Sequence, residues 1–246
     1  MQQGPTILVT RPEPDAGDTA ARLESLGLRP ILAPLLEMHL LPAIAPTTKD
    51  LAAIAITSSN AIRALERLGF HTSLLHLPVF TVGDRTADFA RSAGFENVTS
   101  ATGNFQDLVA VLSKQKFDGQ IYYPTATHIS GDLMGALAPF GQHILVAPIY
   151  QMLPVTALPD EVIDIIESGK LSAISLYSRR TAETFCTLIN DILPDNSRSE
   201  ISALCLSQNV AAPMIAHHFT RIALADYPSE EAMMALALSF TRDQIR

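Results

Sequence analysis

Short apolar runs alternate with amphipathic stretches along the sequence. A β-branched apolar run at residues 6–10 predicts a buried strand. Residues 16–26 carry apolar positions at helical spacing, and Gly27 follows them where a helix commonly ends. Residues 29–33 predict the next strand. The chain therefore opens with a β-α-β unit.

The same alternation continues to the end of the chain. Further strands are expected at 51–56, 78–82, 97–100, 120–123, 143–146, 173–177, 202–206 and 221–224. Helices are expected at 61–68, 84–93, 105–112 after an N-cap at Asn104, 129–138, 160–167, 180–193, 210–219 and after Ser229, with a turn at 124–127. Since each crossover between neighbouring strands is made by a helix, the sheets should be parallel.

An internal repeat divides this pattern into two halves. Three segments recur about 120 to 125 residues later, namely 53–58 at 173–178, 79–83 at 203–207, and 103–104 at 228–229. A nearly constant offset indicates two lobes of one design. We expect an α/β protein with two similar, flavodoxin-like lobes, each a parallel sheet flanked by helices.

Two stretches with an Ala-Pro lead mark the expected crossings between the lobes. They lie at residues 33–40 and 147–153. We expect hinge strands at 35–39 and 148–153, a discontinuous first lobe of residues 1–34 plus 154–246, and a second lobe of residues 40–147. Because two connections at one hinge permit opening and closing around a ligand, Tyr150 is expected beside a cleft.

Composition is that of a globular protein. The 246 residues are 48% hydrophobic and 17% charged, so a large core can be buried without disulfides. Cys186 and Cys205 are expected to be buried structural thiols, which suits a reducing compartment. No apolar run reaches the roughly 18 residues of a membrane span, and no signal segment is recognisable. We therefore expect a cytoplasmic protein without membrane association.

The net charge of −8 argues against nucleic acid as a partner, because phosphate binding favours a basic face. The net charge does not exclude a small anion as a ligand, because local hydrogen-bond donors and arginines determine the binding of small anions. Hydroxyl- and amide-rich turns follow the strands and precede helices, at 10–11, 57–60, 83–86, 125–128, 178–181 and 207–209. Such turns offer free backbone N–H groups at the positive end of a helix dipole. Each turn alone could equally be an N-cap, but the set favours an anionic ligand.

Other catalytic patterns are missing from the sequence. It contains no Gly-rich dinucleotide fingerprint, P-loop or nucleophile elbow, and its histidines lack companions at ligand spacing, so no metal or cofactor is expected. Tyr150 is the isolated candidate for proton transfer, because a phenol stays protonated at neutral pH and can donate to a leaving oxygen. The alternative is a packing tyrosine at the hinge.

Several short motifs together resemble the uroporphyrinogen-III synthase family over nearly the whole chain. They are Leu8-Val9-Thr10-Arg11-Pro12, Ala33-Pro34-Leu35-Leu36, Ile56-Thr57-Ser58-Ser59-Asn60-Ala61, Val82-Gly83-Asp84-Arg85-Thr86-Ala87, Ile149-Tyr150-Gln151 and Tyr177-Ser178. Each motif is weak alone, whereas their order and spacing are specific. The resemblance implies a cofactor-free cytoplasmic enzyme of tetrapyrrole biosynthesis.

The implied reaction is the cyclisation of hydroxymethylbilane, a linear tetrapyrrole with eight carboxylates, with inversion of its last ring, ring D. Loss of the hydroxyl as water leaves an azafulvene, and attack by the substituted carbon of ring D gives a spiro intermediate that fragments and recloses. Without an enzyme the chain closes uninverted. The implied task is therefore to hold a geometry, which agrees with the few catalytic groups in the sequence.

The resemblance also implies site residues. Tyr150 matches the tyrosine proposed to assist departure of the hydroxyl. The expected substrate-binding residues are Thr10, Arg11, Thr57, Ser58, Ser59, Gly83, Arg85, Thr86, Pro124, Thr125, Ser178, Arg179, Ser207 and Gln208. Two departures from the family pattern stand out: residues 124–128 lack the usual glycine and basic residues, and Gln208 replaces a common proline. We expect a monomer that could receive its substrate from the preceding enzyme.

A second class remains open at this point: a two-lobed protein that binds or senses a small anion without catalysis. Such proteins share hinged α/β lobes. The sequence lacks a secretion signal and an appended DNA-binding helix-turn-helix, both of which would favour that class.

Overall fold

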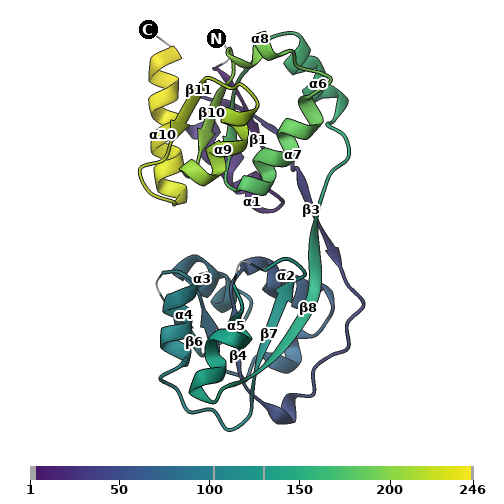
Figure 1. The fold of residues 1–246 in the computed structure, drawn as a ribbon, viewed down its shortest axis with the longest axis vertical. Helices are drawn as coiled ribbons and strands as arrows, with labels where there is room; N and C mark the ends of the chain where they lie inside the picture. Colours follow the sequence, from purple (N-terminus) through teal and green to yellow (C-terminus); the bar gives the residue numbers. More distant parts are fainter. Residues whose placement is uncertain (1–3, 102, 130, 245–246) are drawn as a thin grey trace. The chain divides into compact units, whose positions relative to one another are not determined.

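The chain forms two compact units. The computed structural model describes residues 4–101, 103–129 and 131–244. Unit 1 consists of Met1–Glu37 with Leu153–Arg246, and unit 2 of Met38–Met152 (Figure 1). Two strands, β3 (Leu36–Leu40) and β8 (His143–Pro154), contain the points where the chain passes from one unit to the other. Both chain ends therefore belong to unit 1.

The sheet of unit 1 has five strands in the order β11-β10-β9-β1-β2. These strands are β1 (Thr6–Val9), β2 (Arg29–Leu32), β9 (Leu171–Leu176), β10 (Ser202–Cys205) and β11 (Arg221–Leu224). All neighbouring pairs are parallel. Counted along the chain, the order is 2-1-3-4-5, which also occurs in flavodoxin.

The sheet of unit 2 has the order β3-β8-β7-β4-β5-β6. Its other strands are β4 (Leu51–Ile56), β5 (Val79–Thr81), β6 (Val98–Ser100) and β7 (Gln120–Ala126). The strands from β8 to β6 are parallel to their neighbours. At the edge, the N–H of Leu41 donates to Ile149 O and the N–H of Val155 donates to Leu35 O, so β3 runs antiparallel to β8.

The two sheets have the same strand arrangement, but the chain begins at a different strand of that arrangement in each unit. The sequence repeat pairs β4 and β5 with β9 and β10, and the turn after β6 with the turn after β11. These strands hold corresponding places in the two sheets. The places of β7 and β8 in unit 2 are filled in unit 1 by β1 and β2. The units are therefore similar α/β lobes related by a circular permutation of the chain.

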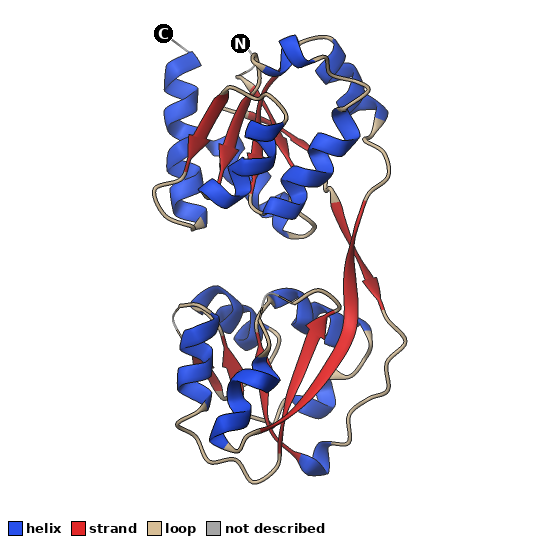
Figure 2. Ribbon diagram, in the orientation of Figure 1, coloured by secondary structure: helices blue, strands red, loops and turns tan. Residues whose placement is uncertain are grey.

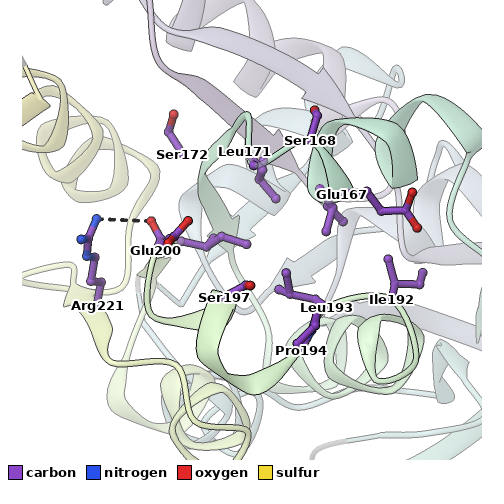
Figure 3. A pocket seen from close by; sticks show the side chains of 13 residues that line it. Glu167, Ser168, Leu171, Ser172, Ile192, Leu193, Pro194, Ser197, Glu200 and Arg221 are labelled. Carbon is purple, nitrogen blue, oxygen red and sulfur yellow. Dashed lines mark hydrogen bonds between the residues drawn. The ribbon is translucent and has the colours of Figure 1, made fainter.

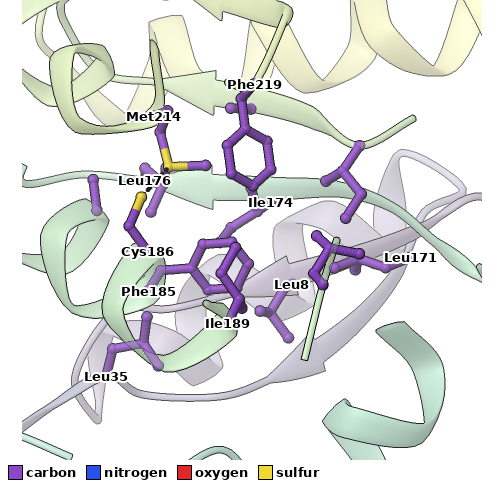
Figure 4. Close-up of a cluster of buried hydrophobic side chains, with 14 of the residues drawn as sticks. Leu8, Leu35, Leu171, Ile174, Leu176, Phe185, Cys186, Ile189, Met214 and Phe219 are labelled. Atoms are coloured by element: carbon purple, nitrogen blue, oxygen red, sulfur yellow. Dashed lines mark hydrogen bonds between the residues drawn. The ribbon is translucent and has the colours of Figure 1, made fainter. Parts of the chain in front are cut away.

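Helices cover both faces of the sheet in unit 1 (Figure 2). On one face α1 (Asp15–Ser25) and α10 (Glu230–Gln244) pack against the sheet. The opposite face is covered by α6 (Asp160–Glu167), α7 (Arg179–Ile189) and α9 (Gln208–Ala216), with the short α8 (Asp195–Arg198) after α7. This face holds a large apolar cluster, in which Phe185 and Met214 meet Leu8, Ile174 and Leu176 of the strands (Figure 4).

Unit 2 has the same three layers. One face of its sheet carries α2 (Ser59–Arg67) and α3 (Asp84–Ser92), and the other carries α4 (Phe105–Leu112) and α5 (Leu133–Leu137). Short 3-10 turns lie at Thr48–Asp50, His71–Leu74 and Ala138–Phe140. The predicted N-cap at Asn104 is confirmed, since Asn104 and Asp107 form a reciprocal capping box.

Several element boundaries predicted from the sequence are wrong: the helix expected at 210–219, for example, spans Gln208–Ala216, and three other differences have a clear physical reason. Residues 124–126 extend strand β7 instead of forming a turn. A proline is tolerated at position 124 because β4 pairs with β7 only as far as Tyr122. The helix expected from residue 129 begins at Leu133, where the side chain of Asp132 supplies the N-cap. The helix expected at 180–193 ends at Ile189, before Pro194 and a separate short helix.

Candidate functional site

The predicted site residues of unit 2 lie at one edge of its sheet. Thr57 and Ser58 directly follow β4, Gly83 follows β5, Thr125 lies near the end of β7, and Tyr150 pairs beside it in β8. Because these strands are parallel, their carboxyl ends meet at the same edge, which is where ligands bind in open α/β sheets. The structure therefore brings these residues together within unit 2.

The turn after β4 begins helix α2. Ser58 is the N-cap residue, and its Oγ accepts a hydrogen bond of 3.2 Å from the backbone N–H of Asn60. Ser59 opens the helix and is half-buried. The first N–H groups of α2 therefore point out of the turn at the positive end of the helix dipole. Such a turn can bind a carboxylate.

A β-bulge sets the position of Tyr150. Thr125 of β7 pairs with Pro148 of β8, whereas the next residue, Ala126, pairs with Tyr150. Ile149 is thus one extra residue in β8, and the backbone N–H of Thr127 donates to Tyr150 O at 3.1 Å. A bulge bends its strand and re-aims the side chains that follow. Here it buries the Tyr150 ring, which is 4% exposed, on the α2 face of the sheet.

The side chain of Ser58 is the polar neighbour of the Tyr150 hydroxyl. Burial raises the pKa of Tyr150 above the ordinary value of 10.0, and the proximity of Tyr123 acts in the same direction. The polar Ser58 side chain and the positive charge of Arg63 oppose this rise. The phenol therefore carries its proton at neutral pH and can donate it in a hydrogen bond.

Sequence reasoning included Asn60 in the turn at 57–60 but missed Arg63, which lies near this tyrosine on α2. Arg63 Nη1 donates to Asn60 Oδ1 at 2.7 Å, and the guanidinium lies 4.6 Å from the centroid of the Phe89 ring. Asn60 Nδ2 contacts Met152 Sδ in β8 at 3.9 Å. Arg63 lies four residues after Ser59, on the same helix face, and that spacing was the available signal.

Tyr123 was also missed. Its hydroxyl lies 3.3 Å from Thr57 Oγ1. The residue is 2% exposed and packs with Ala53 and Ala55 of β4 on the face covered by α4 and α5. The sequence predicts that Tyr123 ends a strand, but it does not predict the contact with Thr57, because Thr57 lies 66 positions earlier in the chain.

The turn after β5 carries three further predicted residues. Gly83 is the N-cap residue of α3, and its carbonyl oxygen accepts a 3.2 Å hydrogen bond from Thr81 Oγ1. Arg85 is exposed, whereas Thr86 is buried. Since Gly83 has no side chain, the first N–H groups of α3 are left open at this edge. Pro124, by contrast, is buried within β7.

In unit 1, Thr10 and Arg11 follow strand β1 and are both buried. Thr10 Oγ1 donates to Ser175 O at 2.8 Å. Arg11 donates to Glu230 and, at 2.9 Å, to Asp15 Oδ2, and its guanidinium lies 4.2 Å from the centroid of the Tyr177 ring. These contacts balance the charge of Arg11 within unit 1 and join β1, α1 and α10.

The turns after β9 and β10 place four predicted residues at the corresponding edge of unit 1. Ser178 caps α7 by accepting from the N–H of Thr181 at 3.1 Å. Arg179 is exposed and bonds Glu183 at 2.8 Å. Ser207 occupies the N-cap position of α9 without a side-chain capping bond, and Gln208 beside it is exposed. The open N–H groups of α9 resemble those of α3 in unit 2.

A pocket of about 760 Å³ lies elsewhere in unit 1 (Figure 3). It lies near the amino ends of β9 and β10, between the end of α6 and the segment around α8, and Glu167, Glu200 and Arg221 are among its lining residues. None of the predicted site residues lines it. Within the described residues, no group of three His, Cys, Asp or Glu side chains is arranged to hold a metal ion. No described helix is long and apolar enough to span a membrane.

Comparisons with known proteins agree on one family. A family profile described as "Uroporphyrinogen-III synthase HemD" matches residues 17–235. The uroporphyrinogen-III synthase of Chlorobaculum parvum is 27% identical over 193 residues, covering 73% of this chain and 77% of that protein. A putative uroporphyrinogen-III synthase of Methanothermobacter thermautotrophicus is 24% identical, covering 96% of this chain and 99% of that protein.

A solved structure shares the fold. The crystal structure of uroporphyrinogen-III synthetase from Helicobacter pylori matches with a TM-score of 0.66 over 96% of this chain and 99% of that one, at 18% sequence identity. This match extends through both units.

Proposed function

The chain belongs to the uroporphyrinogen-III synthase family, and from this membership we propose that it converts hydroxymethylbilane to uroporphyrinogen III with inversion of ring D and loss of water. The observation that carries the proposal is the family match over residues 17–235, which includes strands and helices of both units. The enzyme is a cyclising lyase of tetrapyrrole biosynthesis.

Tyr150 is the proposed proton donor. Its phenol can donate a proton to the substrate's hydroxymethyl oxygen, so that the hydroxyl leaves as water, a protonated (cationic) azafulvene remains and Tyr150 is left as phenolate. Ser58 and Arg63 support this step, because both oppose the rise that burial causes in the pKa of Tyr150. When the final ring closes and regains aromaticity, a carbon-bound proton is released, which replaces the proton that was donated.

Backbone N–H groups are the proposed carboxylate ligands. The substrate has eight carboxylates, whereas the protein has a net charge of −8, so general attraction cannot hold the substrate. Helix N-termini after β4 and β5 in unit 2, and after β9 and β10 in unit 1, can bind carboxylates without net positive charge, and those after β5 and β10 have no side-chain cap. Thr57, Ser59, Thr86, Ser178, Ser207 and Gln208 lie at these turns, together with Arg85 and Arg179.

The two connecting strands are the proposed hinge. Residues 35–39 and 148–153 belong to β3 and β8 or adjoin them, and the part of β8 that belongs to unit 2 runs from His143 through the bulge at Ile149 to Met152. A change of angle in these strands would alter the surroundings of Tyr150 directly. Tyr150 would then connect proton donation with movement of the hinge.

The proposed setting is a cytoplasmic monomer that receives hydroxymethylbilane from the preceding enzyme of the pathway. The support is chemical: hydroxymethylbilane also closes on its own without inversion, so a short transfer time favours the inverted product. Sedimentation of the purified protein tests the monomeric state.

The isomer of the product tests the proposed activity. Freshly made hydroxymethylbilane is incubated with the purified protein, the products are oxidised, and the type I and type III isomers are separated by chromatography. A heat-denatured sample measures spontaneous closure. We expect type III to exceed type I and to increase with protein concentration. If only type I forms, at the rate of the denatured control, the protein lacks this activity and at most binds the substrate.

A further inference from the structure

We propose that Tyr123 is a positioning residue of this site and that it acts through the hydroxyl of Thr57. The inference rests on the proposed function and deepens it by naming a residue that controls binding of a substrate carboxylate. Tyr123 itself does not need to contact the substrate.

Packing fixes the Tyr123 phenol more firmly than the Thr57 hydroxyl. The Tyr123 ring is 2% exposed and lies in the apolar cluster that includes Leu133 and Leu137 of α5. Thr57 is half-buried at the start of the turn. With the two oxygens 3.3 Å apart, the buried phenol is the fixed partner and the threonine hydroxyl is the one that it orients.

The direction of this hydrogen bond decides what Thr57 can offer an anion. Each hydroxyl carries one donor. If Tyr123 donates to Thr57, the Thr57 O–H remains able to donate outward to a carboxylate, and the two bonds strengthen each other. If Thr57 were the donor, it would present only lone pairs, which repel a carboxylate. A bound carboxylate therefore selects the arrangement in which Tyr123 donates.

The neighbouring hydroxyl is already used within the protein. Ser58 Oγ accepts a hydrogen bond from the backbone N–H of Asn60 and lies near Tyr150. Thr57 Oγ1 is paired with Tyr123 of β7 instead. When Tyr123 donates to Thr57, the Thr57 hydroxyl keeps its own proton available for a ligand.

A double-mutant cycle tests the inference. Thr57→Val, Tyr123→Phe and the double variant are compared by steady-state kinetics with hydroxymethylbilane. Losing a hydrogen bond to a charged group should raise KM roughly tenfold in Thr57→Val, with kcat little changed. Tyr123→Phe should raise KM by about threefold, since Thr57 keeps a hydroxyl that is no longer oriented. The double variant should match Thr57→Val, because Tyr123 has no effect once that hydroxyl is gone.

Matched controls separate this role from packing. Tyr122→Phe removes the hydroxyl of the preceding residue in the same strand. Tyr122 is also buried but belongs to the cluster on the other face of the sheet, so this change should leave KM unchanged. Thr57→Ser keeps a hydroxyl at position 57, so its KM should be close to that of the wild type when Tyr123 is present. Combined with Tyr123→Phe, the same substitution should show the raised KM of Tyr123→Phe.

Three results would overturn the inference: an unchanged KM in Tyr123→Phe, effects that multiply in the double variant, or an equal effect of Tyr122→Phe. The proposed function is tested separately, by the wild-type product. If wild type forms no type III, the proposed function fails and this inference fails with it. If wild type forms type III while the cycle fails, only the role of Tyr123 is wrong.

Discussion

The guanidinium of Arg11 forms an ion pair with the carboxylate of Glu230, 219 positions later in the chain. Asp15 binds the other side of the guanidinium, and the Tyr177 hydroxyl donates to the same Glu230 at 3.1 Å. This network joins the first and last parts of the chain inside unit 1. It also occupies a residue that the sequence alone suggested for the substrate.

Replacing Arg11 by alanine should destabilise the protein by about 3 kcal/mol, because two largely buried carboxylates would lose their counter-charge. Urea unfolding of both proteins measures this difference. Arg179→Ala is the control, since its ion pair with Glu183 is exposed on both sides and should contribute less than about 1 kcal/mol. Equal stability of the two variants would indicate that Arg11 is not a structural residue.

Replacing Tyr150 by phenylalanine should lower kcat roughly 100-fold, the usual scale for losing a positioned general acid. The fold should persist, because the buried ring remains and only the hydroxyl beside Ser58 is lost. Steady-state kinetics and thermal unfolding measure the two effects. Tyr227→Phe is the matched control, since Tyr227 is 58% exposed. A Tyr150→Phe enzyme with wild-type kcat would show that the phenol has only a packing role.

Alkaline pH should destabilise the protein through its buried tyrosines. Burial raises the pKa of Tyr122 to about 12, and it also raises the pKa values of Tyr150 and Tyr177. Above pH 10 the unfolded chain loses these protons while the folded protein keeps them, so stability falls as pH rises towards 12. The free energy of unfolding, measured between pH 9 and 11.5, should fall less steeply in Tyr122→Phe. Parallel curves would refute the contribution of Tyr122.

Both cysteines should be unreactive in the native protein. Burial raises the pKa of Cys186 to about 11 and that of Cys205 to about 12, so almost no thiolate is present at pH 8. A thiol reagent such as Ellman's should detect no free thiol until guanidinium unfolds the chain, and two thereafter. Rapid labelling of the native protein would mean that α7 or β10 opens readily.

Local signals predicted most elements of this fold. The helix expected at residues 16–26 and closed by Gly27 is α1 to within one residue, and the helix expected after Ser229 begins at Glu230. The repeat identified β4 and β9 as equivalents. These features depend on the periodicity and end signals of neighbouring residues, which a single sequence contains.

The parts that failed depend on distant residues. A proline at position 124 predicts a turn. The strand continues through Pro124 because the pairing of β7 with β4 ends at Tyr122, so no backbone N–H is needed at residue 124 on that side. The bulge at Ile149 arises because the register between β7 and β8 shifts by one residue, which depends on how two separate strands pair. The Thr57–Tyr123 contact likewise requires that β4 and β7 be neighbours. No periodicity within one segment can reveal such pairings.

The central claim is tested most directly by a single-turnover measurement, with protein in excess over freshly prepared hydroxymethylbilane. The proposal predicts that nearly all substrate appears as the type III isomer, because every molecule is bound before it can close spontaneously. A product that stays entirely type I, at the rate seen without protein, would contradict it.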